Sequence, residues 1–231
     1  MEIRTLQWDS DFFGLRIGRA DILSTEDALF LASQHEELKQ QFDLLYIFDS
    51  NAIGFEAEGA RLVDEKIVYS KPCEPRKQFS DVAFFQGANP SDDLYRLALV
   101  SGGYSRFKLD ERLPKGSYER LYNRWIENAC PKEGTNKQIL LFKDGQNVAR
   151  GMITIDHQGE LGHIGLVAVD TDAQHQGIGG KIMSTLDGYL FEYGIKTLEV
   201  PTQKANTDAC RWYEKNGFVQ KSVTQIYHWW L

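Results

Sequence analysis

The stretch from residue 174 to residue 180 has the residue types and the spacing to bind phosphate. It reads Gln-His-Gln-Gly-Ile-Gly-Gly, after a β-branched apolar run and before apolar residues at helical spacing. We therefore expect a turn from a strand into a helix. Glycines let such a turn bend tightly and leave no Cβ between the backbone amides and a ligand. Those amides have no partner within the helix and lie at the positive end of its dipole, which favours an anion.

The spacing of the glycines narrows the choice of phosphate ligand. A Walker loop requires G-x-x-x-x-G-K-[ST], but residue 175 is histidine and the lysine after Gly180 is followed by Ile182. A dinucleotide-binding loop requires G-x-G-x-x-G, and its third glycine position is again Ile182. The pattern that fits is Q-x-x-G-x-G, filled by Gln174, Gly177 and Gly179. The structural alternative is a glycine-rich turn that binds no ligand.

The Q-x-x-G-x-G loop and the Val-Ala-Val-Asp at residues 167–170 resemble the pyrophosphate loop and the central strand of the GNAT superfamily of N-acyltransferases. The resemblance implies the GNAT acyl-CoA N-acyltransferase fold, a mixed sheet of the α/β (α+β) class. It also implies acetyl-CoA as the acyl donor and no metal. The pantetheine arm would pair with the strand edge as an added strand. The residues implied at the donor site are Val167, Ala168, Val169, Gln174, His175, Gln176, Gly177, Ile178, Gly179, Gly180, Met183 and Asn206.

Tyr213 is the predicted general acid. It follows Asn206 by seven residues, about two helical turns, so both side chains can face the donor. In the resembled superfamily a tyrosine at this place protonates the departing thiolate. The alternative for Tyr213 is a core aromatic, since Trp212 and Phe218 are close in sequence. Asn206 can bind the pantetheine and can also cap the helix that it precedes.

His163 is the predicted general base. It stands at i, i+2 and i+4 with Gly165 and Val167, so an unbroken strand would place all three on one face. It lies eleven residues before Gln174, where many members of the superfamily carry a glutamate base. An imidazole can accept a proton near neutral pH. The alternatives are a histidine at the mouth of the cleft and a water relay that does not use it. A backbone amide of the same strand is the predicted oxyanion donor.

A second set of residues resembles one family within the superfamily, the dTDP-fucosamine acetyltransferases. The set comprises Trp8 with Phe12-Phe13-Gly14, Ser105-Arg106-Phe107, Arg124-Trp125-Ile126-Glu127-Asn128-Ala129, and Asn206-Thr207 before Tyr213. This resemblance spans nearly the whole chain. It implies that the 4-amino group of a dTDP-linked amino-dideoxy sugar attacks the thioester directly, and that Phe13, Arg106 and Phe107 contact this acceptor. The planar guanidinium of Arg106 would suit the diphosphate. A surface ion pair is the alternative for this arginine.

Two other functions remain open at this point. One is a GNAT enzyme that acts on a protein, a peptide or another small-molecule amine. The acidic balance of the chain would suit a cationic acceptor of this kind. The other is a non-catalytic module that binds coenzyme A. An intact phosphate loop together with Asn206 and Tyr213 argues against a module without catalysis.

The composition limits the partners. The chain has 231 residues and a formal net charge of -7, which disfavours nucleic acid. No apolar run approaches the ~20 residues of a membrane span, and the first residues lack the apolar core of a signal peptide. Three widely spaced cysteines form no metal-binding pattern, and together with that start they predict a cytoplasmic protein with reduced thiols. Trp229-Trp230 could form a strand-pairing surface or a homodimer surface.

The element pattern indicates two parts, a smaller αβ domain with a linker at residues 1–87 and a full GNAT domain at residues 88–231. Strands are expected at residues 2–8, 15–22, 44–48, 61–70, 138–142, 147–156, 161–169, 197–201 and 218–230. Helices are expected at residues 24–40, from 52, 91–102, 118–129, after the loop to 192, and 206–216. Residues 71–87 are the expected linker. Residues 55–69 weakly repeat 213–227, which indicates a partial internal copy or chance similarity.

Overall fold

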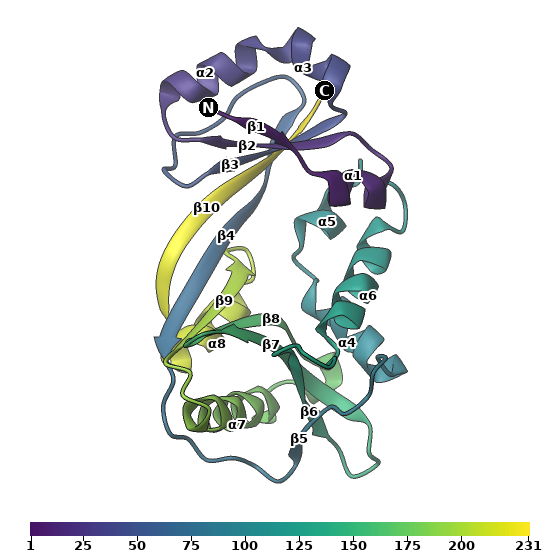
Figure 1. The fold of residues 1–231 in the computed structure, drawn as a ribbon, viewed down its shortest axis with the longest axis vertical. Helices are drawn as coiled ribbons and strands as arrows, with labels where there is room; N and C mark the ends of the chain where they lie inside the picture. The colour runs from purple at the N-terminus through teal and green to yellow at the C-terminus, as the bar shows by residue number, and fades with distance from the viewer.

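A computed structural model describes residues 1–231, and its central feature is one sheet of ten strands (Figure 1). The strand order is β1-β2-β3-β10-β4-β9-β8-β7-β6-β5, with parallel pairing only for β2–β3 and β8–β9. The strands are β1 (Ile3–Thr5), β2 (Ile17–Ile22), β3 (Leu44–Asp49), β4 (Ala60–Pro72), β5 (Val82–Phe84), β6 (Gln138–Lys143), β7 (Ala149–Gln158), β8 (Leu161–Val169), β9 (Thr197–Gln203) and β10 (Val219–Trp230). The predicted mixed α/β class is confirmed.

Helices cover both faces of this sheet. They are α1 (Gln7–Phe13), α2 (Thr25–Ser33), α3 (His35–Gln41), α4 (Asp92–Ser101), α5 (Arg106–Leu109), α6 (Ser117–Ala129), α7 (Ile178–Glu192) and α8 (Thr207–Lys215), with a 3-10 turn η1 (Thr171–Ala173). Alternate residues of β7 show the two faces, because Ile153 packs with α7 and Met152 packs with α4 and α6. The helices α4 to α6 and the helices α7 and α8 therefore lie on opposite faces.

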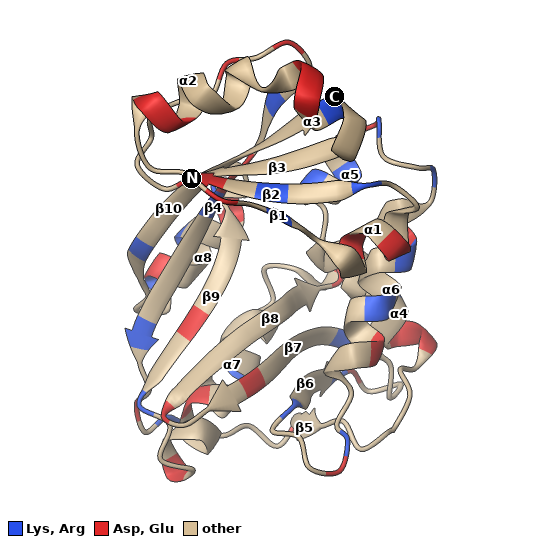
Figure 2. Cartoon of the chain, turned by 45° about the horizontal axis from the view of Figure 1, so that its top comes forward, with Lys and Arg blue, Asp and Glu red and all other residues tan.

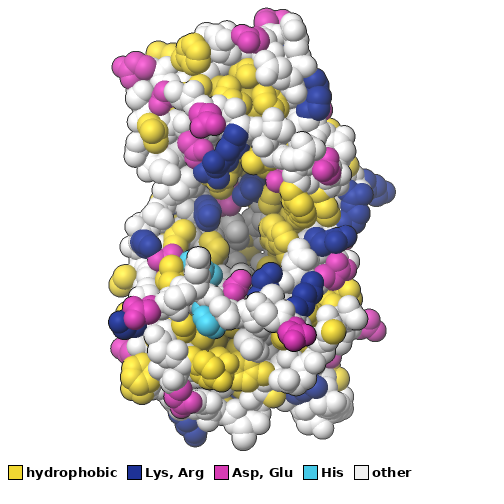
Figure 3. All heavy atoms as spheres, viewed as in Figure 1, with side chains coloured by type: hydrophobic (Ala, Val, Ile, Leu, Met, Phe, Trp, Pro, Cys, Tyr) yellow, Lys and Arg dark blue, Asp and Glu magenta, His cyan; other side chains and the backbone are white.

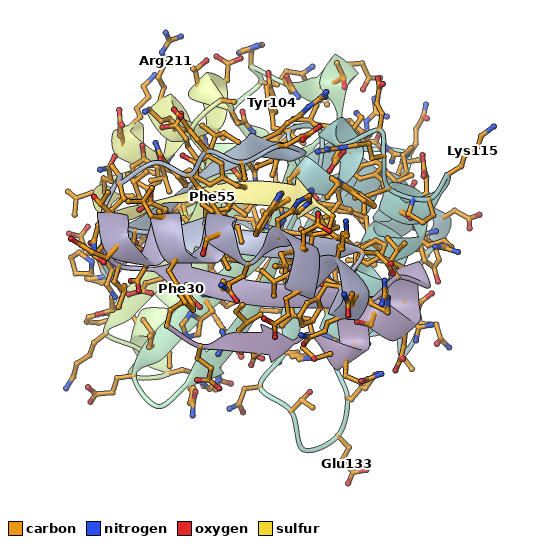
Figure 4. All side chains as sticks on the ribbon, turned by 90° about the horizontal axis from the view of Figure 1, so that it is seen from above. Phe30, Phe55, Tyr104, Lys115, Glu133 and Arg211 are labelled. Carbon is orange, nitrogen blue, oxygen red and sulfur yellow. The ribbon has the colours of Figure 1, made fainter.

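The last strand ties the two ends of the molecule together. β10 lies between β3 and β4 and pairs antiparallel with both. Its C-terminal part is covered by α2 and α3, whose Leu31 and Leu38 share a core cluster with Trp229. Phe55 packs edge-on against the Trp229 indole and lies beside β10 in the view from above (Figure 4). The boundary predicted between residues 87 and 88 falls between β5 and α4, and strands from both sides of it are hydrogen-bonded in one sheet.

Several expected elements differ from the structure. The helix expected at 24–40 is interrupted at Gln34 and forms α2 and α3, although Ser24 caps it as its position predicts. The helix expected from residue 52 is wrong: the carboxylate of Asp49 accepts hydrogen bonds from the amides of Asn51 and Gly54 and holds that segment in a turn. The repeat of residues 55–69 and 213–227 therefore comprises the paired strands β4 and β10 but no second helix.

Two further elements were not expected. Residues 7–13 form α1 where a strand end and a turn were predicted, and Gly14 ends this helix in the left-handed region, at φ 68°. A short edge strand, β5, lies within the expected linker and pairs with β6. Of the two alternatives for Trp229-Trp230, the structure shows strand pairing: both residues pair with β3, Trp229 is fully buried, and the Trp230 indole donates to Asp110.

The feature that positions the site is the separation of two neighbouring strands. β8 and β9 pair only through residues 161–163 of β8 and then diverge. On its other side β8 stays paired with β7 as far as Val169. The residues of β8 after His163 therefore have one edge that no strand covers. None of the helices is long and apolar enough to span a bilayer.

Candidate active site

A cavity of about 1030 Å³ opens where β8 and β9 diverge. One part of its wall comes from β8, the turn before α7, β9 and α8, and the other from β4, α5 and α6. The space-filling view shows the molecule hollowed at mid-height, with Lys and Arg side chains near the opening (Figure 3). We call the first part the donor end and the second part the acceptor end. No cluster of His, Cys, Asp and Glu that could hold a metal ion is present.

The predicted phosphate loop forms the floor of the donor end. His175 and Gly177 both have positive φ, 61° and 79°, and turn the chain sharply into α7. No side chain caps the N-terminus of α7, so its first amides are free for a ligand. A Cβ built on Gly180 would meet no atom within 4 Å, which leaves open space directly above the helix. These features fit a pyrophosphate group.

Most of the predicted donor residues lie on the cavity wall. They are Val167, Ala168, Val169, Gln174, His175, Gly177, Ile178, Gly179, Gly180 and Asn206. Two do not. Met183 is 1% exposed and packs in the core cluster under α7, because its position on the helix faces the sheet. Gln176 points away from the cavity wall, and its side-chain amide donates to the carbonyl of Asp172.

Asn206 and Tyr213 lie on α8 as the spacing predicts. The Oδ1 atom of Asn206 accepts a hydrogen bond from the amide of Ala209 at 3.2 Å and caps the helix, while the residue still lines the cavity. Tyr213 is 4% exposed, and its ring packs against Tyr69 and Phe218. It also lines the cavity, and its hydroxyl forms no hydrogen bond with another residue. Burial raises its pKa further, so the phenol stays protonated.

A bulge in β8 changes the predicted position of His163. The β7 residues Ile153 and Ile155 face Val167 and Ile164, so three steps along β8 match two along β7. The extra residue reverses the alternation of side chains. Ile164 and Val167 consequently both pack toward α7, and His163 lies on the opposite face, which α6 covers. The prediction that His163 and Val167 share a face is wrong. His163 is exposed and lines a separate hollow beside α6, not the main cavity.

Arg106 and Phe107 lie at the acceptor end, on the short helix α5. The hydroxyl of Ser105 accepts a hydrogen bond from the amide of Phe107 and caps this helix. The Arg106 guanidinium stands 4.3 Å from the Phe107 ring centre and 5.2 Å from that of Tyr46. Its Nε atom is buried without a hydrogen-bond partner, and no carboxylate pairs with it, so the alternative of a surface ion pair does not occur. Phe13 stacks on Phe107 from behind at 5.7 Å and does not reach the cavity.

Asp64 is a cavity residue that the sequence gave no reason to select. It lies on β4, is 8% exposed, and its Oδ1 atom is buried with no hydrogen-bond partner. Burial raises its pKa to about 6, although Arg106 and Lys66 oppose the shift. In the sequence this acid stands beside Glu65 and Lys66 and looks like part of a solvated strand. Only the sheet order, which places β4 between β10 and β9, shows that it is buried.

A buried polar cluster fixes α5 against the last strand. Asp110, directly after α5, accepts hydrogen bonds from His228 at 2.7 Å, from the Trp230 indole at 2.9 Å and from Arg112 at 3.0 Å. Burial alone would raise the pKa of Asp110, but these hydrogen bonds lower it. Because the ionised carboxylate only accepts, the Nδ1 atom of His228 carries the proton. The cluster holds the C-terminal end of β10 against the helix that carries Arg106.

Comparison with known proteins agrees with this geometry. The family model described as "Acetyltransferase (GNAT) family" matches residues 103–218, half of the chain. The chain is 28% identical over 222 residues to a dTDP-fucosamine acetyltransferase of Escherichia coli O6:H1. This alignment covers 93% of this chain and 92% of that protein. The matched family segment contains α5, α6, the loop and α8, and the relative extends the match over the N-terminal strands.

Solved structures share the fold at low sequence identity. A conserved protein of unknown function from Staphylococcus epidermidis superposes with a TM-score of 0.62 at 15% identity, over 94% of this chain and 85% of that one. A GCN5-related N-acetyltransferase from Kribbella flavida superposes with a TM-score of 0.53 at 11% identity, over 92% of this chain and 80% of that one. These likenesses confirm the predicted fold.

Proposed function

The chain belongs to the acetyltransferase (GNAT) family, and we propose that it transfers the acetyl group of acetyl-CoA to the 4-amino group of a dTDP-linked amino-dideoxy sugar. Membership in the family makes the chain an acyltransferase and acetyl-CoA its donor. The proposal for the acceptor is supported by the relative at 28% identity, named for its action on dTDP-fucosamine. It is carried by one observation: the donor end opens into an acceptor end that holds a buried, unpartnered carboxylate, Asp64, beside the unpaired Arg106.

Two ends of one cavity bring donor and acceptor together. Acetyl-CoA supplies an acetyl thioester when it is bound. The uncovered edge of β8 from Val167 to Val169 would pair with its extended pantetheine arm, and the amides from Gln174 to Gly180 would bind its pyrophosphate. Amides of the same strand would stabilise negative charge as it develops on the carbonyl oxygen.

The amine must lose a proton to attack, and two residues are candidates for accepting it. Asp64 lines the cavity, and no residue of the protein hydrogen-bonds its carboxylate, which would accept a hydrogen bond from an ammonium group. His163 was the candidate from the sequence, and the bulge places it in the hollow next to α6, where a water molecule would have to relay the proton. We propose Asp64 as the direct base, because of these two residues only Asp64 lines the cavity that Tyr213 also lines.

Tyr213 would donate the second proton. Its hydroxyl is free of other hydrogen bonds, its residue lines the cavity, and burial keeps it protonated. It therefore suits the protonation of the sulfur that leaves when the acetyl group moves to the amine. Asn206, two turns earlier on α8, would hold the pantetheine so that the sulfur reaches this hydroxyl.

The test is the release of free thiol from acetyl-CoA in the presence of matched amines. We expect rapid release with a dTDP-linked 4-amino-4,6-dideoxy sugar and slow release with a polyamine and with a peptide bearing a free N-terminus. Mass spectrometry of the sugar should show one added acetyl group. If the peptide or the polyamine is acetylated well and the sugar is not, the acceptor class proposed here is wrong. If coenzyme A binds but no amine releases thiol, the chain is a binding module.

A further inference from the structure

Two basic side chains line the acceptor end of the cavity without a carboxylate partner. Lys66 lies on β4 and Arg106 on α5, and both are partly buried in the cavity wall. Of the acids near them, Glu65 pairs with Lys204 at 2.8 Å, and Asp64, whose charge acts on both cations, forms no ion pair or hydrogen bond with either. The chain has 33 acidic and 26 basic side chains, so a shortage of acids does not explain two unpaired cations. Buried or partly buried basic groups are normally paired.

Other basic groups lie close to Lys66. Burial lowers the pKa of Lys66, and the charges of Arg106 and Arg19 lower it further, while Asp64 opposes the shift. Burial also lowers the pKa of Arg106, although Asp64 and Asp9 oppose it. The charge map shows basic segments on both β2, which carries Arg19, and α5 (Figure 2). Like charges that are brought together away from water are costly unless an anion joins them.

Arg19 is not free to take part directly. Its guanidinium donates to Asp21 at 3.0 Å and lies 3.6 Å from the centre of the Phe48 ring. It adds to the positive field, while Lys66 and Arg106 keep their donors available. No residue accepts a hydrogen bond from the Arg106 side chain, the buried Nε atom included.

β4, which carries Lys66, also carries Asp64, the carboxylate that would bind the amine of the acceptor. Asp64 and Lys66 stand at i and i+2 on β4, so their side chains leave the same face with Cα atoms ~7 Å apart. The acceptor end thus offers a carboxylate for an ammonium group and, about one sugar ring away, a pair of cations for an anion. A polyamine or a cationic peptide would place positive charge next to Lys66 and Arg106 and be repelled.

We propose that Lys66 and Arg106 bind the phosphate attached to the sugar ring of the acceptor, and that the enzyme thereby selects amines that carry a phosphate one sugar ring away. The inference rests on the proposed function, and it adds Lys66 as a residue that determines specificity. The anionic group could belong to a sugar 1-phosphate or to a nucleoside diphosphate sugar. The shared chemistry is the phosphate on the anomeric oxygen.

The first experiment compares three acceptors that differ only in this group: the dTDP-linked 4-amino-4,6-dideoxy sugar, its 1-phosphate and its methyl glycoside. In Lys66→Ala the KM for both phosphorylated acceptors should rise about 10- to 100-fold, the factor of one charge-assisted hydrogen bond. The KM for the methyl glycoside and for acetyl-CoA should not change. Lys66→Arg should restore most of the loss. The matched control is Lys108→Ala, since Lys108 is exposed on α5 and lies outside the cavity wall.

Preference between the two phosphorylated acceptors identifies the source of the anion. Equal KM values indicate that one phosphate suffices, and a lower KM for the dTDP sugar indicates that the second phosphate or the nucleotide is also bound. Either result supports the phosphate pair. A change in KM that is the same for the methyl glycoside as for the phosphorylated sugars would overturn the inference, because Lys66 would then act on fold or on catalysis in general.

A binding measurement separates this inference from the proposed function. Calorimetry with dTDP is carried out with coenzyme A at saturation, so that the loop before α7 is already filled. Wild type and Lys108→Ala should bind dTDP, and Lys66→Ala should bind it at least about 10-fold more weakly. This result would stand even if no amino sugar were acetylated. Equal dTDP affinity in wild type and Lys66→Ala would refute the phosphate pair even in an active enzyme.

Discussion

The donor end and the acceptor end of the cavity are built in different ways. The donor end comes from one continuous stretch of the chain, from β8 to α8, and it offers mainly backbone groups: the uncovered edge of β8 and the free amides that start α7. The acceptor end comes from segments far apart in the sequence, β4, α5 and α6, and it offers charged side chains such as Asp64 and Arg106. We therefore expect the donor end to recognise its ligand through main-chain groups, and the acceptor end through the charges of buried side chains.

This difference predicts how substitutions will act. Backbone recognition tolerates changes of neighbouring side chains but fails when a side chain fills the space of the ligand. Side-chain recognition fails when a single charge or hydroxyl is removed, even if the fold is unchanged. Tyr213 lies on α8 and lines the same cavity, and in the proposed mechanism it protonates the departing sulfur. We therefore expect the largest effect there.

Replacing Tyr213 by phenylalanine removes one hydroxyl and keeps the ring that packs against Tyr69 and Phe218. If this hydroxyl protonates the departing sulfur, kcat and kcat/KM should fall together by ~10² to 10⁴, with acetyl-CoA affinity nearly unchanged. Steady-state kinetics with thermal melts alongside test this. A normal kcat in a well-folded Tyr213→Phe would mean that Tyr213 is a core aromatic without a catalytic role and that solvent protonates the sulfur.

Asp64→Asn tests the acceptor end. The base must be ionised to take a proton, and burial raises the pKa of Asp64 to about 6. For wild type, kcat/KM should therefore be level above this pH and fall about tenfold per unit below it, because this parameter reports the free enzyme. Asp64→Asn should lower kcat/KM about 100-fold and remove that acid limb.

His163→Gln is the matched variant for the competing base. Asp64 as the base predicts that this variant keeps the wild-type pH profile and most of the rate, since His163 lies outside the main cavity. A loss of about 100-fold in His163→Gln, together with a nearly normal Asp64→Asn, would show that a water relay through the hollow beside α6 carries the proton.

The same difference decides what could be inferred from the sequence. The turn from β8 into α7 at residues 174–180 was predictable because it depends on local backbone geometry, which glycine spacing encodes. The bounds of β8 were predicted correctly. Helical periodicity also predicted that Asn206 and Tyr213 lie two turns apart along one helix. Asp64 was not predictable, because its burial depends on β10 returning from the end of the chain to lie beside β4.

His163 shows a different limit of prediction from the sequence. Period-two alternation placed it on a face with Val167, and one extra residue in β8 reversed that alternation. The bulge lies at Gly165-Leu166, where the amide of Leu166 donates to the side-chain hydroxyl of Thr154 on β7, at 2.7 Å, and not to a backbone carbonyl of that strand. A glycine within a strand can signal such a bulge. That signal is in the sequence, but the face of His163 depends on how the strand is paired.

Gly180→Val tests recognition by the backbone at the donor end. A Cβ at Gly180 meets no protein atom within 4 Å, whereas one at Gly179 would come within 3.2 Å of the Trp212 ring. Gly180→Val therefore fills the ligand's space without straining the protein, and the acetyl-CoA dissociation constant should rise about 10- to 100-fold. Calorimetry measures it, with Gly145→Ala, in an exposed turn, as the control. Unchanged affinity in Gly180→Val would contradict the loop assignment.

The smallest expected effect concerns the cluster that holds α5 in place. His228 is fully buried, and burial lowers its pKa to about 4, although the hydrogen bond to Asp110 opposes the shift and the charges of Arg106 and Arg112 add to it. In the unfolded chain its pKa is about 6.5. Above this pH both states bind the same number of protons, and His228 adds no slope.

As the pH falls from about 6.5 to about 4, only the unfolded chain protonates this histidine, so the free energy of unfolding should fall by up to about 1.4 kcal/mol per pH unit. The lowered pKa of Asp110 acts below this window, because its stabilisation is lost only as the carboxylate protonates. His228→Gln keeps a donor for Asp110 but does not titrate in this range, so it should lack this part of the slope. Urea titrations at several pH values measure the difference, with the exposed His163→Gln as the control. Identical slopes for His228→Gln and wild type would mean that His228 is protonated in the folded state. The Asp110 carboxylate would then form an ion pair with a charged imidazolium instead of accepting a hydrogen bond from a neutral imidazole.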